Sequence, residues 1–364
     1  MKSIVAIFNL VIFPLTLVWS FLTLISLIAP YVSPEWISYI PLFGLALPLL
    51  FLGNLLLLVY WAFQKKIRTL IPAVLIAFAF GPISNYYQFN NEAEPKDNLK
   101  ISTFNCNLFG YYQENWFVDS VIQILQTENS DVTLLQEVFS KEGSLEKLLY
   151  HIKDKTPFKH IAIVRLNKQR EYGMCILSKF PIENFDRIAF NDQTGNMAMY
   201  ADIIVNHDKQ SKSIRFYNIH LQSFRFSKTD YFTVKKAQEN TDFDQVGTEN
   251  IINTMREAYK LRARQVKILK TAIEKFRKPR ILGGDFNDVP QSYTYKSISE
   301  NLNDAFIEKG NGFETTYKGP FPSFRIDYIF ASEPFIFSSY NNRKDVPGDH
   351  CFISSSVDLS QVFE

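Results

Sequence analysis

The chain has 364 residues, of which 46% are hydrophobic and 21% are charged, so it is too apolar and too weakly charged to be intrinsically disordered. Its formal charge is +2, from 39 basic and 37 acidic residues, which excludes a protein that holds polyanions by bulk electrostatics alone. Its three cysteines, Cys106, Cys175 and Cys351, are too few and too far apart for a disulfide scaffold. A single hydrophobic core stops growing near about 250 to 300 residues. The length therefore predicts either one large domain and a further part, or two domains.

Charged residues are missing from three long stretches at the amino end, residues 3–34, 36–64 and 69–91. A membrane-spanning helix needs about 20 predominantly apolar residues. If each stretch is a helix, its apolar side chains lie on all sides and not along one stripe. This distribution disfavours buried core helices of a soluble protein. The first run is also longer than the apolar region of a signal peptide, and it lacks a small-x-small cleavage site. The sequence therefore predicts three transmembrane helices, at residues 4–28, 36–63 and 70–87.

Basic residues flank these predicted helices unevenly. Lys2 precedes the first helix, the loop at 33–35 has no basic residue, and the second loop contains Lys65, Lys66 and Arg68. Short loops rich in Lys and Arg stay in the cytoplasm. Because the number of predicted spans is odd, we expect an integral, multi-pass membrane protein whose soluble part is extracytoplasmic. The spans carry no charged residue, which excludes a transporter or channel.

Downstream of a polar linker at 90–98, short strand-like runs alternate with helical ones. Strands are predicted at residues 99–105, 132–136, 160–165, 174–178, 199–205, 214–219, 281–283, 326–330 and 351–357, and helices at 116–127, 144–152 and 251–276. The helices are too few to connect every strand pair, which favours an α/β sandwich of mixed sheets over a doubly wound parallel sheet. Residues 224–249 break the rhythm and are predicted to form a mobile flap. The predicted domains are a membrane domain at 1–89 and a soluble domain at 99–364, joined by the linker.

Polar side chains gather where the predicted strands stop. They are Asn105 and Asn107, Gln136-Glu137, Asn218 and His220, the run Gly284-Asp285-Phe286-Asn287, and Asp349-His350. Each group alone is typical of a turn or a solvated loop, but together they supply the oxygen ligands that hard divalent cations such as Mg²⁺ prefer. Asp327 lies instead inside an apolar strand, where a carboxylate is costly unless it is paired, and an imidazole is its natural partner.

The order Asn, Gln-Glu, Asn-x-His, Gly-Asp-Phe-Asn, Arg-x-Asp-Tyr and Asp-His resembles that of the endonuclease/exonuclease/phosphatase superfamily. This superfamily includes deoxyribonucleases, abasic-site endonucleases, sphingomyelinases and inositol polyphosphate phosphatases. The resemblance runs from about residue 98 to the C-terminus, and two further blocks agree with it, residues 173–182 and Thr316-Tyr317 ahead of residues 325–328. It implies a four-layer sandwich of two packed mixed β-sheets flanked by helices, with the site at one rim.

Five of these residues correspond to metal and phosphate ligands under the same resemblance. Glu137 corresponds to the principal metal ligand, and Asn107 and Asp349 contribute directly or through water. The implied cofactor is Mg²⁺ or Mn²⁺. Asn105 and Asn287 correspond to residues that hold phosphate oxygens.

Four further residues correspond to catalytic groups. His220 supplies charge or a proton to the phosphate, and Asp285 orients the attacking water or protonates the leaving oxygen. His350, which Asp327 orients and keeps basic, acts as the general base. In this family the division of labour between Asp285 and His350 is open, and the sequence leaves both assignments standing.

Two details bear on the substrate. Asn107 stands where abasic-site endonucleases have an aspartate, and residues 217–221, Tyr-Asn-Ile-His-Leu, look like the sphingomyelinase and deoxyribonuclease forms. The resemblance implies a membrane-anchored, metal-dependent phosphoesterase that hydrolyses phosphodiester bonds in the manner of an endonuclease. A phospholipid or sphingomyelin-type phosphodiesterase is the first alternative, and an inactive membrane-anchored binding module is the second. The expected partners are a nucleic-acid or phospholipid substrate and the lipid bilayer, whereas no protein partner can be inferred.

Overall fold

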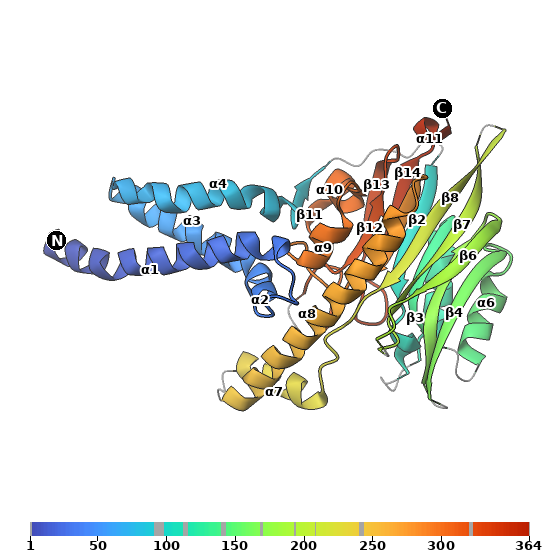
Figure 1. The fold of residues 1–364 in the computed structure, drawn as a ribbon, viewed down its shortest axis with the longest axis horizontal. Helices are drawn as coiled ribbons and strands as arrows, with labels where there is room; N and C mark the ends of the chain where they lie inside the picture. The colour runs from blue at the N-terminus through green and yellow to red at the C-terminus, as the bar shows by residue number, and fades with distance from the viewer. Residues whose placement is uncertain are drawn as a thin grey trace.

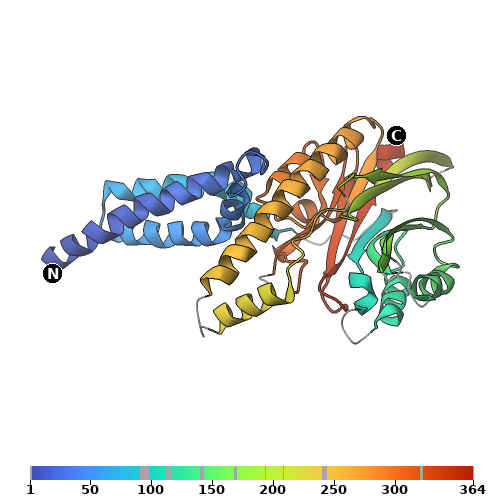
Figure 2. The same cartoon turned by 60° about the horizontal axis from the view of Figure 1, so that its bottom comes forward.

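The computed structural model of the chain describes residues 2–90, 98–111, 116–139, 143–167, 170–192, 194–207, 209–239, 244–319 and 323–363. Most of the predicted linker at 90–98 lies outside these ranges. Figure 1 shows a β-structure with helices on its outer faces, and a set of N-terminal helices that run side by side away from it. The N-terminus lies at the far end of these helices, and the view in Figure 2 gives the same arrangement.

Twelve strands form two six-stranded sheets. The first sheet has the order β13 (Ile336–Arg343), β14 (Phe352–Asp358), β2 (Asn98–Asn105), β3 (Val132–Phe139), β5 (Arg170–Ser178) and β4 (Phe158–Asn167). The second sheet has the order β10 (Asn303–Asp304), β12 (Asp327–Ala331), β9 (Arg280–Asp285), β8 (Gln210–His220), β7 (Met197–His207) and β6 (Ile182–Ala189). Because β2–β3 and β8–β9 are parallel and the other pairs are antiparallel, both sheets are mixed.

The main core lies between the two sheets. Ile101 and Leu134 of the first sheet belong to the same buried cluster as Met199, Phe216 and Ile329 of the second. The central strands β2, β3 and β12 are buried almost throughout because their outer faces are also covered.

Helices cover the two outer faces. On the first sheet, α5 (Val118–Glu128) and α6 (Ser144–Ile152) bury residues such as Val121 and Leu148. On the second sheet, α8 (Gln245–Glu274) and α9 (Tyr293–Ile298) bury residues such as Leu269 and Tyr295. The predicted α/β fold of two packed mixed sheets flanked by helices is therefore confirmed.

Some elements differ from the prediction. The pattern missed β6 and β13 because both are edge strands whose side chains are mainly exposed or half-exposed. The predicted flap at 224–249 is largely helical, since it contains α7 (Lys228–Gln238) and the start of α8. The remaining short helices are η3 (Asn107–Gly110), α10 (Ala305–Lys309) and α11 (Ser360–Phe363).

The N-terminal part contains α1 (Lys2–Ile28), α2 (Ile40–Leu45), α3 (Leu47–Phe63) and α4 (Leu70–Ser84), with short 3-10 turns at Ala29–Tyr31 and Ile67–Thr69. Two stretches, Ala6–Tyr31 and Ile67–Ser84, are long and apolar enough to cross a membrane. The predicted second span at 36–63 is wrong in extent, because α3 has only 17 residues and α2 is a separate helix. Pro48 stands in the first turn of α3, where proline fixes the start of a helix.

Several polar side chains inside this helical bundle form hydrogen bonds between helices. Trp61 Nε1 donates to Thr16 Oγ1 at 3.0 Å, and Asn54 Nδ2 donates to Thr23 Oγ1 at 2.8 Å. Trp19 Nε1 donates to the backbone oxygen of Leu50 at 2.9 Å. These contacts join α1 to α3 and satisfy polar groups in a bundle whose outer surface is apolar.

The bundle also docks on the sheets through hydrogen bonds. β1 (Tyr87–Phe89), which follows α4, pairs antiparallel with β11 (Asn311–Phe313). Buried Gln291 donates from Nε2 to the backbone oxygen of Ser26 at 2.9 Å, and Arg325 donates from Nη1 to the backbone oxygen of Asn85 at 3.1 Å. The N-terminal helices therefore have a fixed position relative to the β-structure.

Candidate active site

Strand register brings three of the predicted residues together at one rim of the second sheet. His220 ends β8 and pairs with Asp285 at the end of parallel β9. Asp285 in turn pairs with Asp327, the first residue of antiparallel β12. Polar side chains at the ends of three neighbouring strands thus lie in one row.

The first sheet contributes to the same rim. Asn105 ends β2 and pairs with Gln136 on parallel β3. The register of β3 against β5 then shifts between Leu135 and Val138, and Glu137 lies in this bulge with a left-handed φ of 49°. Bulges next to active sites re-aim side chains. The bulge therefore explains how Glu137 points into the site from a strand that is otherwise buried.

Gln136 and Asn218 connect the two sheets beneath this rim. Gln136 Nε2 donates to Asn218 Oδ1 at 2.7 Å and to Thr103 Oγ1 at 2.9 Å. Asn218 Nδ2 donates to the backbone oxygen of Leu135 at 2.9 Å. Both side chains are fully buried. Two of the strand-end residues noted in the sequence thus fix the spacing of the sheets and do not face the cavity.

Asp285 lies at the centre of the site, with only 1% of its surface exposed. Its Oδ2 accepts from Asn105 Nδ2 and Asn287 Nδ2, both at 3.0 Å, and its Oδ1 accepts from the Asn287 backbone N–H at 2.8 Å. The same Oδ2 lies 3.7 Å from His350 Nε2 and 3.8 Å from His220 Nε2. Burial raises the pKa of Asp285, and the neighbouring His350 opposes that rise.

His350 is paired with Asp327. Both carboxylate oxygens of Asp327 lie 3.0 to 3.1 Å from Nδ1 of His350, and the Asp327 backbone N–H donates to Thr316 Oγ1 at 3.0 Å. Although burial favours the neutral imidazole, the carboxylates of Asp327 and Asp285 raise the pKa of His350 well above its usual value. With Nδ1 held in this way, Nε2 faces Asp285.

Residues 102–350 match the family model that is described as the endonuclease/exonuclease/phosphatase family. The chain belongs to this family. A second model, described as a domain of unknown function, matches residues 8–86. Members of the endonuclease/exonuclease/phosphatase family are generally hydrolases that act on phosphoester bonds, and they generally use divalent metals.

Solved structures of this family share the fold. A family member from Bacteroides vulgatus is 18% identical, with a TM-score of 0.51 over 73% of this chain and 100% of that chain. One from Leptotrichia buccalis is 17% identical, with a TM-score of 0.51 over 71% and 99%. One from Beutenbergia cavernae is 16% identical, with a TM-score of 0.52 over 72% of each chain. No curated protein matches the chain. The similar structures cover the β-structure and its helices, so they support the fold.

The predicted metal ligands of this family member lie beside the row at the rim. Asn107 Nδ2 donates to Asp349 Oδ1 at 2.6 Å. Burial and the nearby Asp349 carboxylate raise the pKa of Glu137 to about 7. The carboxylates of Glu137 and Asp349 disfavour each other's negative charge. A divalent cation would neutralise both, and such cations prefer oxygen ligands of this kind.

A second group of potential ligands lies nearby. Atoms of Asp285, Asp327 and His350 all lie within 4.8 Å of one another. Both carboxylate oxygens of Asp327 already contact Nδ1 of His350. The group therefore fits a hydrogen-bonded Asp–His pair that shares a proton better than it fits a cation site.

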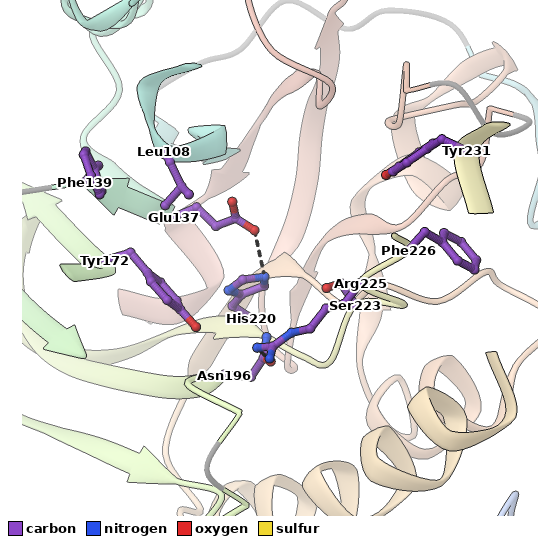
Figure 3. A pocket seen from close by; sticks show the side chains of 10 residues that line it. All are labelled: Leu108, Glu137, Phe139, Tyr172, Asn196, His220, Ser223, Arg225, Phe226 and Tyr231. Atoms are coloured by element: carbon purple, nitrogen blue, oxygen red, sulfur yellow. Dashed lines mark hydrogen bonds and ion pairs between the residues drawn. The ribbon is translucent and has the colours of Figure 1, made fainter. Parts of the chain in front are cut away.

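His220 faces Glu137 across the cavity, as Figure 3 shows. Its Nε2 lies 3.5 Å from Glu137 Oε1 and has no hydrogen-bond partner among the described residues. Burial lowers the pKa of His220 to about 4, so its ring is neutral near pH 7. A neutral ring can donate a hydrogen bond from an N–H to a phosphate oxygen. Of the two roles expected from the sequence, charge or a proton, the lowered pKa of His220 therefore disfavours charge.

The cavity in Figure 3 has a volume of about 520 Å³ and includes residues that the motifs did not contain. Arg225 reaches it from the segment after β8, where its guanidinium donates to the backbone oxygen of Thr194 and, at 3.3 Å, to Asn196 Oδ1. Tyr172 and Tyr231 line it as well. Arg225 and Tyr231 belong to the predicted flap, whose mix of basic and aromatic residues was the available signal, whereas nothing in the sequence distinguished Tyr172 or Asn196.

Proposed function

We propose that the chain is a membrane-anchored, divalent-metal-dependent phosphoesterase that hydrolyses phosphodiester bonds, with residues 99–364 as its catalytic domain. The observation that carries this proposal is the environment of Asp285. One buried carboxylate contacts two amides, from Asn105 and Asn287, and lies within 4 Å of two imidazoles, from His220 and His350. Such a convergence of acid, base and hydrogen-bond donors at the floor of a cavity is what phosphoryl chemistry requires.

Glu137, Asp349 and Asn107 are the residues proposed to hold the cation, Mg²⁺ or Mn²⁺. Glu137 and Asp349 line the cavities at the rim, and Asn107 contacts Asp349 through its side-chain amide. The raised pKa of Glu137 supports a site that is incomplete without positive charge. When bound, a divalent cation neutralises phosphate charge and polarises phosphorus.

The residues around Asp285 are assigned to the water and the phosphate. Asn105, Asn287 and His220 are proposed to donate hydrogen bonds to phosphate oxygens, and Asp285 orients a water molecule. His350, held by Asp327, takes one proton from that water at Nε2. The water oxygen bonds to phosphorus, one ester P–O bond breaks, and the leaving oxygen takes up a proton from solvent. The products are a phosphomonoester and an alcohol.

The N-terminal helices are proposed to anchor the enzyme in a bilayer as a domain of residues 1–89. Leu10, Phe63 and Phe78 are exposed by 79%, 85% and 68%, and such apolar surface is costly in water. If α1 and α4 cross the bilayer, α3 must return the chain between them. Its 17 residues reach about 25 Å at 1.5 Å per residue, which local thinning of the bilayer accommodates.

We propose that the catalytic domain is extracytoplasmic. Lys65, Lys66 and Arg68 lie at the end of the bundle that also carries the N-terminus, because Asn9 bonds Gln64 at 2.8 Å and Arg68 stacks on Phe13. Basic loops stay in the cytoplasm. Reporter fusions after residue 95 test this. An active alkaline phosphatase and a dark fluorescent protein are expected, and the reverse pattern would put the enzyme in the cytoplasm.

Activity of the purified full chain in detergent tests the proposed reaction. We expect hydrolysis of bis-p-nitrophenyl phosphate with Mg²⁺ or Mn²⁺, its loss with excess chelator, and its return when the metal is restored. Hydrolysis of a diester that a chelator leaves unchanged would reject metal dependence. No hydrolysis of this ester, of DNA, of RNA or of phospholipid under any metal condition would favour an inactive binding module.

A further inference from the structure

A second cavity, of about 370 Å³, opens from the same catalytic residues but has a different lining. Asp285, Asn287, Asp349 and His350 line part of it. The rest is largely apolar, from Leu45, Phe224, Phe226, Ile251, Met255, Phe324 and Ile326. Glu137 and Arg225 line both this cavity and the one in Figure 3. The proposed position of the phosphate is therefore the junction between the cavity in Figure 3, which has polar and apolar walls, and a largely apolar cavity.

One wall of the apolar cavity comes from the N-terminal part of the chain. Leu45 ends α2, and α2 is fixed against the catalytic part. A Cβ on Gly44 would lie only 2.2 Å from the backbone oxygen of Gln291, so the two backbones are in close contact there. Arg256 of α8 donates from Nε to Ser38 Oγ at 3.0 Å and stacks on Tyr39 at 3.8 Å. The apolar cavity is thus complete only when both parts of the chain are present.

The apolar cavity adjoins another cavity that lies nearer the helices proposed to face lipid. This neighbouring cavity, of about 220 Å³, shares Leu45 and Phe324 with the apolar cavity and reaches Pro48 and Leu49 in the first turn of α3. Leu49 is 63% exposed on the outer surface of the bundle. Trp36, in the link before α2, is 83% exposed, as suits an aromatic residue at a membrane interface. Leu45 and Phe324 therefore separate two neighbouring cavities, one at the catalytic residues and one beside the start of α3, near the proposed bilayer surface.

We infer that the substrate is a membrane phospholipid, whose apolar chain lies along Leu45, Met255 and Phe324 while its polar headgroup enters the cavity beside Asn196 and Arg225. This inference rests on the proposed phosphodiesterase function and names its substrate class. A nucleic acid would need basic groups along its path. Among the described residues that line these three cavities, Lys and Arg are represented only by Arg225 and by Arg325, whose charge is paired with Asp304.

Kinetics on the full chain in mixed micelles test this inference. Met255→Gln should lower kcat/KM for a long-chain phosphatidylcholine at least tenfold more than kcat/KM for bis-p-nitrophenyl phosphate. Ile268→Gln, on the exposed side of the same helix, is the matched control and should change neither. Equal loss on both substrates, or faster hydrolysis of DNA than of phospholipid by the wild type, would overturn the inference while leaving the phosphodiesterase in place. Failure on every diester would reject the phosphodiesterase as well.

Photo-crosslinking of the wild type gives a readout that needs neither turnover nor a variant. A phosphatidylcholine with a diazirine at the end of one acyl chain is incubated with the full chain in vesicles, with chelator, and illuminated. We expect labelled peptides that contain Leu45, Leu49 or Met255, and loss of this label when unlabelled phosphatidylcholine competes. Labels restricted to the outer faces of α1 and α4, with none on these peptides, would mean that lipid surrounds the bundle without entering the site.

Discussion

The rim of the two sheets and the N-terminal bundle are held together in different ways. At the rim, Asp285 and Asp327 are buried carboxylates whose oxygens form hydrogen bonds with Asn105, Asn287 and His350. In the bundle, a few pairs such as Asn54 with Thr23 lie inside a surface of exposed apolar side chains. The rim thus depends on exact polar geometry, and the bundle depends on apolar contact and on the solvent around it.

This difference indicates what each region can tolerate. A substitution at the rim that removes one charge leaves its buried neighbours unpaired and alters chemistry directly. A substitution in the bundle or its docking surface shifts helices and changes stability or access first. Substitutions in the two regions should therefore differ in whether they change turnover or stability first.

The largest effect is expected at Glu137 and Asp285. Glu137→Gln and Asp285→Asn should each lower turnover of a soluble phosphodiester at least about a hundredfold, since positioned acid–base groups contribute roughly 10² to 10⁴. The fold should survive, because both replacements keep the shape of the side chain. Exposed Glu146→Gln on α6 is the control and should retain full activity. Near wild-type turnover of either rim variant, with unchanged thermal unfolding, would remove that residue from the site.

Asp327→Asn should act through His350 with a smaller loss and a changed pH profile. Without the carboxylate the pKa of His350 falls, so the rise in rate with pH, which follows formation of the neutral imidazole, should move to lower pH. A profile identical to that of the wild type would show that the pair has no role in proton transfer.

The pair of His350 and Asp327 should also make the stability of the fold depend on pH. The pKa of His350 is raised above its usual value of 6.5 in the folded protein, so protonation stabilises the fold below about pH 6.5 and this contribution is lost as pH rises through the folded-state pKa. The difference in Tm between wild type and Asp327→Asn should therefore be widest in acid and narrow in alkali. A difference that widens with pH would contradict the direction of the shift.

Docking of the bundle can be tested with two glycines. Gly44→Ala places a Cβ 2.2 Å from the Gln291 backbone oxygen, and we expect a loss of about 1 to 3 kcal/mol from the resulting overpacking. At Gly81 in α4 a Cβ meets no atom within 4 Å, so Gly81→Ala should be neutral or stabilise by about 0.5 to 1 kcal/mol. Thermal unfolding in detergent measures both. Equal stability of the two variants would mean that α2 does not pack on the catalytic part.

The smallest effect is expected for the ion pair between Arg264 of α8 and Glu35, whose Nε and Oε1 are 2.9 Å apart. The Arg264 side chain is 60% exposed and that of Glu35 is 35% exposed, and such pairs contribute about 0 to 1 kcal/mol. A double-mutant cycle with Arg264→Gln and Glu35→Gln should give a coupling in that range. A coupling above about 2 kcal/mol would mean that this contact is a main support of docking.

Much of the rim could be predicted because strand ends carry a local signal. Asp285 and Asn287 follow an apolar strand directly, and the cost of a carboxylate in the strand that contains Asp327 pointed to an imidazole partner. The structure places Asp327 against His350, and it brings Glu137, Asp349 and Asn107 to the same rim. The sequence did not separate Gln136 and Asn218 from these residues, since only the folded structure shows the hydrogen bond by which they bridge the sheets below the cavity.

The apolar cavity could not be predicted, for a physical reason. Leu45 and Met255 appear in the sequence as ordinary apolar positions of two helices far apart in the chain, and their proximity depends on how the bundle docks. The short length of α3 was hidden in a similar way, because the apolar run continues through Pro48 where the helix starts. A hydropathy pattern reports the solvent that a segment prefers and not where its helices begin.

Hydrolysis in ¹⁸O-labelled water tests the central claim, that water activated at this rim attacks phosphorus, most directly. Wild-type enzyme with Mg²⁺ should give a phosphomonoester with one ¹⁸O bound to phosphorus and an unlabelled alcohol, as mass spectrometry of the products would show. Asp285→Asn and the chelated wild type should give only background product. Label in the alcohol, or labelled phosphomonoester formed equally well by Asp285→Asn, would contradict the account.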